Sequence, residues 1–161
     1  MKANSIKGNS AKEIQEKLEK ILTNDFEPNL AIVFSSVSRN NNAIVNILDK
    51  NAITVFGSTT AGEFIDGDYG NNSTAILLLE INPAFFKLYF EESAKNETQV
   101  KAQNLAKQAV NQFNNPAFIV AGSGLTVDGE LIIRGIEDAA GTDTTIPFGL
   151  LHCHENFGLC G

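Results

Sequence analysis

The sequence predicts an α/β fold: a mixed β-sheet with parallel βαβ units and an antiparallel meander, and helices packed on the sheet. Two observations predict it. Continuously apolar stretches rich in β-branched residues, typical of strands covered on both faces, alternate with stretches whose apolar residues recur at helical spacing. Between residues 73 and 92, two β-rich runs are separated only by Asn82-Pro83, as in an antiparallel meander. The 161 residues suit one domain of this kind.

The first half of the chain carries the signals of a helix followed by a βαβ unit. Ser10 and Glu13 have the spacing of a capping box, and an amphipathic helix is expected after them. Buried strands are expected at residues 30–34 and 52–56, with a helix at residues 43–50 between them. A strand, a helix and a second strand in this order predict two parallel neighbours.

The second half continues the alternation of strands and helices. Residues 84–92 alternate apolar and polar side chains, which predicts a strand with one buried face. A later helical pattern stops at Asn114-Asn115-Pro116, because proline disfavours a helix just before it. The elements expected here are strands at 73–81 and 84–92, a helix at 98–113, a strand at 117–121, a turn at Gly122-Ser123-Gly124, a helix at 129–140 and a strand from Ile146.

The expected domain organisation has three parts. Residues 1–9 are polar and are predicted to be a flexible N-terminus. Residues 10–149 are predicted to form a single domain. Residues 150–161 are predicted to be an atypical C-terminal tail, since no periodic pattern continues into them.

The composition excludes several classes of function. A formal net charge of -7 gives no general attraction to nucleic acid or to anionic lipid. The longest apolar runs are far shorter than the roughly 20 residues of a membrane helix, so no membrane insertion is expected. The N-terminus lacks the apolar stretch of a secretory signal, and both cysteines lie close together near the C-terminus. A cytoplasmic location is therefore expected.

Polar and small residues follow three of the predicted strands, at the carboxyl ends where α/β sheets bind ligands. The stretch at residues 57–63 supplies hydroxyls, backbone amides and one carboxylate, which suits a small polar ligand. It is not a phosphate loop, because no lysine follows its second glycine. The alternative is a tight turn whose hydroxyls bond their own backbone. The candidate ligand-binding residues, expected to share one rim, are Ser35, Ser36, Gly57, Ser58, Thr59, Thr60, Gly62, Glu63 and Ser123.

Neither a catalytic triad nor a metal site is predicted. Ser123 lies between two glycines without the spacing of a nucleophile elbow, and the only histidines are His152 and His154 in the tail. Together with Cys153 and Cys160 they could ligate a metal, but their spacing is not that of a zinc site and no second segment supplies ligands. We therefore expect no catalysis, no metal and no cofactor.

Residues 31–36, 55–63 and 73–81 resemble the N-terminal FIST domain. The likeness continues through residues 131–136 and 146–148, so that it covers roughly residues 30–149. Its most specific part is the Thr-Thr-Ala-Gly-Glu run that ends at Glu63. Most of the ordered chain is thus similar to this family.

The resemblance implies an intracellular sensory domain, joined to signal-transducing modules and binding small ligands such as amino acids. Only residues 57–63 are carried over as its motif. FIST proteins usually continue into a C-terminal half and into a Gly-Gly turn, whereas residues 149–154 do not match and the chain stops at Gly161. The resemblance therefore implies a truncated copy, or a frame-shifted end after Phe148.

Three hypotheses follow, of which a sensory small-ligand-binding domain leads. The alternatives are a small α/β enzyme that uses the hydroxyls of residues 57–63, and a dimerising remnant that binds no ligand. A homodimer is expected through residues 146–148 or 84–92, because an unpaired strand edge is a template for another strand. The charges of Lys87, Glu91 and Glu92 favour the first of these edges.

Overall fold

The computed structural model describes residues 1–22, 25–65, 67–94, 96–123 and 127–151. These residues form two compact units, where the sequence analysis expected one domain over residues 10–149. The first unit spans Met1–Lys87 and the second begins at Leu88. No helix among the described residues is long and apolar enough to cross a membrane.

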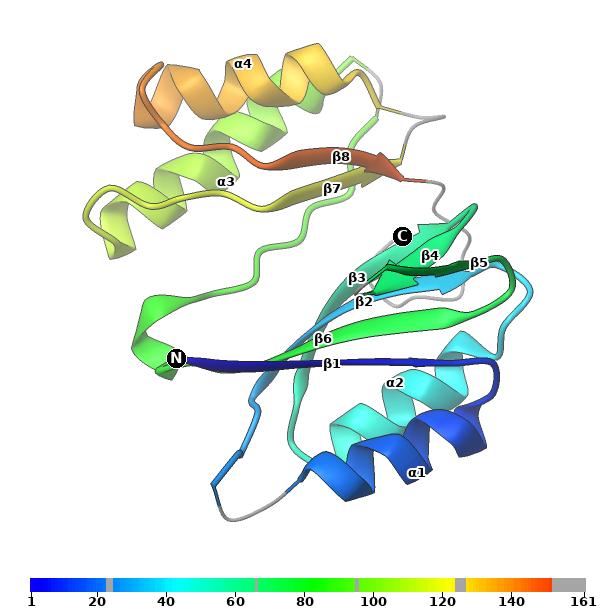
Figure 1. The fold of residues 1–161 in the computed structure, drawn as a ribbon. Helices are drawn as coiled ribbons and strands as arrows, with labels where there is room; N and C mark the ends of the chain where they lie inside the picture. Colours follow the sequence, from blue (N-terminus) through cyan, green and yellow to red (C-terminus); the bar gives the residue numbers. More distant parts are fainter. Residues whose placement is uncertain (23–24, 66, 95, 124–126, 152–161) are drawn as a thin grey trace. The chain divides into compact units, whose positions relative to one another are not determined.

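The first unit is a four-stranded mixed sheet with helices packed on it, which confirms the predicted fold class (Figure 1). The strand order is β1-β6-β2-β3, with β2 and β3 parallel and β6 antiparallel to both β1 and β2. Helix α2 connects β2 to β3, as the predicted βαβ unit requires. The elements are β1 (Lys2–Gly8), α1 (Ala11–Ile21), β2 (Leu30–Ser36), α2 (Asn41–Lys50), β3 (Thr54–Thr60) and β6 (Thr74–Glu80).

Helices α1 and α2 cover the same face of this sheet (Figure 1). The core lies between them and the sheet, and it consists of aliphatic side chains. Four of these, Ile14 and Leu18 from α1 and Ile44 and Leu48 from α2, are at most 1% exposed. Burying a side chain of this size contributes about 1.5–3 kcal/mol, so this layer supplies most of the apolar burial of the unit. Their partners on the sheet include Ala31, Val33, Ile76 and Leu78.

Both helices of the first unit begin at one edge of the sheet. Since β1 and β2 are both antiparallel to β6, strands β1, β2 and β3 run in the same direction and their carboxyl ends meet there. Helix α1 starts with the predicted capping box: Glu13 N donates to Ser10 Oγ over 3.2 Å, and Asn9 N donates to Glu13 Oε2 over 2.8 Å. At the start of α2, Ala43 N donates to Asn40 Oδ1 over 3.1 Å.

Two features of the first unit differ from the sequence prediction. The N-terminal segment, which was expected to be flexible, forms strand β1 and is paired along its length with β6. The sequence of β1 does not show the apolar pattern of a strand, because only Ile6 and Gly8 in it are buried. A hairpin of β4 (Glu63–Ile65) and β5 (Asp68–Gly70) was not predicted, since its strands have only three residues each.

The predicted strand at residues 84–92 is wrong. Residues Pro83–Phe85 form the 3-10 helix η1, and residues 86–92 belong to no strand. Proline at the first position favours this helical turn, and Ala84 N donates to Asn82 Oδ1 over 2.9 Å to cap it. The alternation of apolar residues after it finds no partner strand among the described residues.

The second unit contains another parallel βαβ arrangement. Strand β7 (Val120–Ser123) pairs in parallel with β8 (Phe148–Leu151), and α4 (Gly129–Ala140) connects them. Helix α3 (Thr98–Gln112) packs on α4. The predicted helices at 98–113 and 129–140 are confirmed, and both strands lie two to three residues later than expected.

Candidate functional site

The stretch at residues 57–63 is mostly strand rather than loop. Residues 57–60 complete β3, Ala61 and Gly62 turn the chain, and Glu63 opens β4 (Figure 1). The apolar pattern ends at Phe56, but the strand continues because its backbone stays paired with β2 as far as Thr60 and Ser36. The site is therefore the end of a strand and the hairpin that follows it.

Strand register brings the predicted residues of β2 and β3 together. Ser35 pairs with Thr59, and Ser36 pairs with Thr60, at the carboxyl ends of the two parallel strands. Ser35 also pairs with Thr74 on the other side. Because side chains alternate along a strand, Ser35, Thr59 and Thr74 share the face of the sheet that the helices cover. Ser36 and Thr60 lie on the opposite face.

On the helix-covered face, four polar residues form the helix-side cluster: Ser35, Asn41, Thr59 and Thr74. Each is at most 2% exposed. Ser35 Oγ donates to Asn41 Oδ1 over 2.7 Å, and the hydroxyls of Ser35 and Thr74 lie 2.6 Å apart. Because the Ser35 hydroxyl gives its one proton to Asn41, Thr74 is the donor to Ser35.

On the opposite face, Glu63 is the centre of a second group, which we call the Glu63 cluster (Thr60, Glu63 and Ser73). The carboxylate is 1% exposed. Its Oε1 accepts from Thr60 Oγ1 over 2.8 Å, and its Oε2 accepts from Ser73 N and Oγ over 3.1 and 2.9 Å. A buried carboxylate needs such donors to offset its lost hydration. Glu63 thereby fastens β4 to the end of β3 and to the chain entering β6.

Three further polar residues, Ser36, Ser38 and Asn72, are hydrogen-bonded to one another near the Glu63 cluster. Ser36 is 7% exposed, and its hydroxyl lies 3.0 Å from that of Ser38. Ser38 Oγ donates to Asn72 Oδ1 over 2.7 Å. Sequence reasoning missed Ser38 and Asn72. The available signal was weak: Asn72 has a φ of 59°, a left-handed conformation that asparagine adopts more readily than most residues.

Arg39 is a further residue that sequence reasoning missed. It lies in the connection between β2 and α2, and its Nη1 donates to Asn9 O in the turn between β1 and α1. Its buried Nε has no hydrogen-bond partner among the described residues. No carboxylate in the described part of the chain forms an ion pair with it. An arginine in the short connection after a strand, in a chain with an excess of acidic residues, is the signal that could have found it.

Three of the predicted residues have local roles. Ser58 Oγ donates to Thr59 O over 3.2 Å and is fully buried, which is the backbone bonding that the alternative interpretation expected of a hydroxyl here. Gly57 is required by a close approach, because a Cβ at this position would lie 2.3 Å from Val33 O. At Gly62 a Cβ would lie 2.8 Å from Tyr69 Oη.

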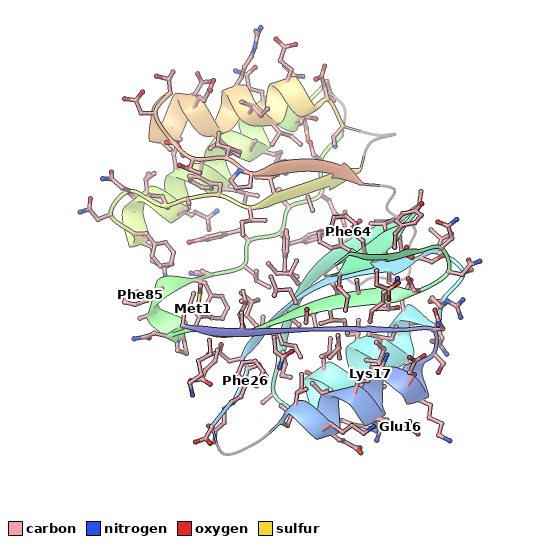
Figure 2. The ribbon with its side chains drawn as sticks, viewed as in Figure 1. Met1, Glu16, Lys17, Phe26, Phe64 and Phe85 are labelled. Atoms are coloured by element: carbon pink, nitrogen blue, oxygen red, sulfur yellow. The ribbon has the colours of Figure 1, made fainter. Side chains whose placement is uncertain are left out.

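The hairpin β4–β5 exposes two aromatic side chains beside these groups. Phe64 and Tyr69 are paired across the hairpin and are 72% and 69% exposed. Figure 2 shows Phe64 on the hairpin. Facing residues on one side of a strand pair lie about 4.5–5.5 Å apart, so the two rings form one apolar surface.

The remaining predicted residues cannot be joined to this site. Ser123 ends β7 in the second unit, and its place on the same rim stays a prediction. His152, Cys153, His154 and Cys160 lie outside the described residues. Among the residues that the structure describes, no group of three or more His, Cys, Asp or Glu side chains is placed to hold a metal ion.

Comparison with known protein families matches the FIST N domain over residues 29–150. The match begins just before β2 and extends into β8, so it includes the βαβ arrangements of both units. Neither the search of curated proteins nor the search of solved structures gave a match.

Proposed function

Because the chain belongs to the FIST N domain family, whose members are sensory domains of signal transduction, we propose that it binds a small polar ligand at the carboxyl ends of β2 and β3. The ligand class is an amino acid or a similar small metabolite, and the signal passes to an effector domain or protein. One observation carries this proposal. The polar residues Ser36, Ser38, Thr60 and Asn72 lie together at the carboxyl ends of β2 and β3. Ligands of open α/β sheets bind at such edges.

The chemistry of this edge matches the two ends of an amino acid. Hydroxyl and carboxamide groups accept hydrogen bonds from an ammonium group. Arg39 supplies a positive charge, and its buried Nε forms no hydrogen bond among the described residues. Guanidinium groups bind carboxylates through paired hydrogen bonds. Glu63 is buried, so its role in this proposal is to position Thr60 and the hairpin rather than to touch the ligand.

Thermal-shift measurements against the standard amino acids test the proposal. A ligand at about 100 times its Kd stabilises the folded state by roughly 2.7 kcal/mol, which corresponds to a rise in Tm of about 5 °C or more. Thr60→Val should abolish the rise. Thr54→Val is the matched control, because it makes the same change at the exposed amino end of the same strand. Loss of the rise in both variants contradicts the proposal. So does the absence of a rise in the native protein with every amino acid.

Arg39→Gln tests the proposed partner of the ligand carboxylate. It should weaken binding of an amino acid about tenfold or more, and it should leave unchanged the weaker binding of the corresponding amino acid amide. Arg134→Gln is the control, since Arg134 is paired with Glu130 in α4. Calorimetric titration measures both. Equal weakening for the acid and the amide places the carboxylate elsewhere.

No catalysis is part of the proposal. The described residues contain no histidine, and Thr60 donates its proton to Glu63 within a buried contact. We place the protein in the cytoplasm, in keeping with the intracellular sensory role. NMR spectra of an identified ligand should stay unchanged over a day with the protein present. The appearance of a product would favour the enzyme alternative.

We also propose a homodimer formed through the edge of β8. In the described part of the chain β8 pairs only with β7, and an isolated pair of strands is marginally stable. An antiparallel pairing of two β8 edges would give a twofold dimer. Light scattering at micromolar concentrations should give about twice the chain mass of 17.4 kDa. A monomer at all concentrations overturns the dimer and leaves the ligand proposal intact.

A further inference from the structure

The helix-side cluster contains two polar atoms without a protein partner. Among the described residues, Asn41 Nδ2 and Thr59 Oγ1 are buried and form no hydrogen bond. Asn41 is 2% and Thr59 is 1% exposed. Nearly all buried polar groups in folded proteins are paired with protein or with ordered water. Two orphan atoms in one cluster therefore point to a bound molecule between them.

The register of the sheet places the two atoms around one serine. Thr59 pairs with Ser35 across the parallel strands β2 and β3, which lie about 4.8 Å apart. Ser35 Oγ in turn holds Asn41 Oδ1 at 2.7 Å. The Asn41 carboxamide and the Thr59 hydroxyl thus flank the same Ser35 side chain. They connect the first residue of α2 with the end of β3.

The chemistry of the cluster selects the bound molecule. Asn41 Nδ2 can only donate, whereas Thr59 Oγ1 can donate or accept. Ser35 Oγ donates to Asn41 and accepts from Thr74, so it keeps one lone pair. No member carries a charge, which disfavours an ion, and an NH₂ group cannot ligate a cation. Water is a small neutral molecule that accepts one hydrogen bond and donates another, and buried waters have two to four such partners.

We propose that the helix-side cluster binds one internal water molecule that accepts a hydrogen bond from Asn41 Nδ2 and forms another with Thr59 Oγ1. The water joins the start of α2 to the end of β3. It lies on the face of the sheet opposite Ser36 and Thr60, so it is distinct from the proposed ligand site. Thr59 then serves this internal bridge rather than the ligand.

Thr59→Val tests the bridge through the sign of the change in stability. Valine has the shape of threonine without the hydroxyl. If the hydroxyl holds a water, its loss weakens the bridge and leaves Asn41 unsatisfied, and Tm should fall by several °C. If the hydroxyl is a true orphan, its removal relieves a buried polar atom and Tm should rise. Thr54→Val, at the exposed end of the same strand, should change Tm by less than about 1 °C.

Magnetic relaxation dispersion of water provides a second readout that does not depend on stability. The native protein and Thr59→Ser, which keeps the hydroxyl, should each show one more long-lived internal water than Thr59→Val. If Thr59→Val does not fold, Asn41→Leu, which has a similar size but neither polar atom of the carboxamide, should lose the same water. An equal number of long-lived waters in the native protein and in the folded variants overturns the proposal, as does a rise in Tm for Thr59→Val.

Discussion

The two units of the molecule use the same βαβ motif with different interiors. In the first unit the helices rest on the sheet through large aliphatic side chains, and Ile14, Leu18, Ile44 and Leu48 are almost completely buried. In the second unit the buried apolar residues of the helix pair are Ala106, Ala109 and Ile136. One motif is thus stabilised in one place by side-chain volume and in the other by close approach of two helices.

The close approach in the second unit depends on a glycine. A Cβ at Gly135 of α4 would lie 2.3 Å from Gln99 O and 2.9 Å from Ala102 Cβ on α3. Small residues bury little apolar area, which scales with stability at about 25 cal/mol per Å². We therefore expect the first unit to be the more stable of the two.

The largest expected effect is that of Gly57→Ala. The new Cβ would lie 2.3 Å from a backbone oxygen of the neighbouring strand, and no rotamer change can relieve this contact. The loss should exceed the roughly 1–3 kcal/mol of ordinary overpacking. Gly135→Ala is the counterpart in the second unit, where two helices can separate slightly, so its cost should be smaller. Urea denaturation of both variants measures the difference, and an equal cost would contradict the distinction between the interiors.

Truncation of a buried isoleucine to alanine, made once in each unit, should have the next largest effect on stability. Ile44→Ala removes a side chain from a core of large aliphatic groups, whereas Ile136→Ala removes one from a helix pair whose other buried apolar residues are Ala106 and Ala109. Such changes cost about 2–5 kcal/mol, depending on how far the surroundings collapse. We expect Ile44→Ala near the upper end and Ile136→Ala near the lower end. A larger loss for Ile136→Ala in chemical denaturation would reverse the predicted order of stability.

The parts of the fold that the sequence predicted have local signals. The capping box at Ser10 and Glu13, helix α4 and the unit β2–α2–β3 each follow from spacing within a few residues. Strand β1 could not be predicted, because its polar residues become a strand only through pairing with β6, about 70 residues later. Residues 84–92 have the periodicity of a strand but lack the partner that a strand needs.

The candidate site also has features that the sequence predicts and features that it does not. Its location at the ends of β2 and β3 follows from the order of elements. Its separation into two faces follows only from register, which places Ser35 with Thr59 and Ser36 with Thr60. The burial of Glu63 could not be predicted either, because its partner Ser73 is ten residues away and is brought close by the hairpin.

Glu63→Gln tests the hydrogen bonds by which Glu63 of this hairpin holds Thr60 and Ser73 in the first unit. The amide keeps one acceptor but turns an NH₂ group toward one set of donors, so at least one hydrogen bond is lost. The expected cost is about 1–3 kcal/mol. Hydrogen exchange of the Ser73 amide should quicken, while amides of the second unit keep their protection. Glu16→Gln on the exposed surface of α1 is the control and should leave stability and exchange unchanged (Figure 2).

The smallest expected effect on stability is that of replacing the glutamate in the first turn of one helix in each unit, Glu13 in α1 and Glu130 in α4. Glu13 at the start of α1 accepts from Asn9 N and pairs with Lys17, and the hydrogen bond from Asn9 is the main reason that its pKa lies below the usual value of 4.5. Glu130 at the start of α4 forms no such box and pairs with Arg134 at the surface.

A lowered pKa in the folded state means that the ionised form of Glu13 stabilises folding. This contribution is complete above pH 4.5, the usual value, and is lost as the pH falls through the lower pKa of the folded state. Glu13→Gln should therefore be less stable than the native protein at pH 7, by at most about 1 kcal/mol because the group is partly exposed. The difference should shrink below pH 4.5 in denaturation curves taken at successive pH values. Glu130→Gln should show a smaller difference at pH 7, and a difference that is constant with pH for Glu13→Gln would exclude the capping box as its cause.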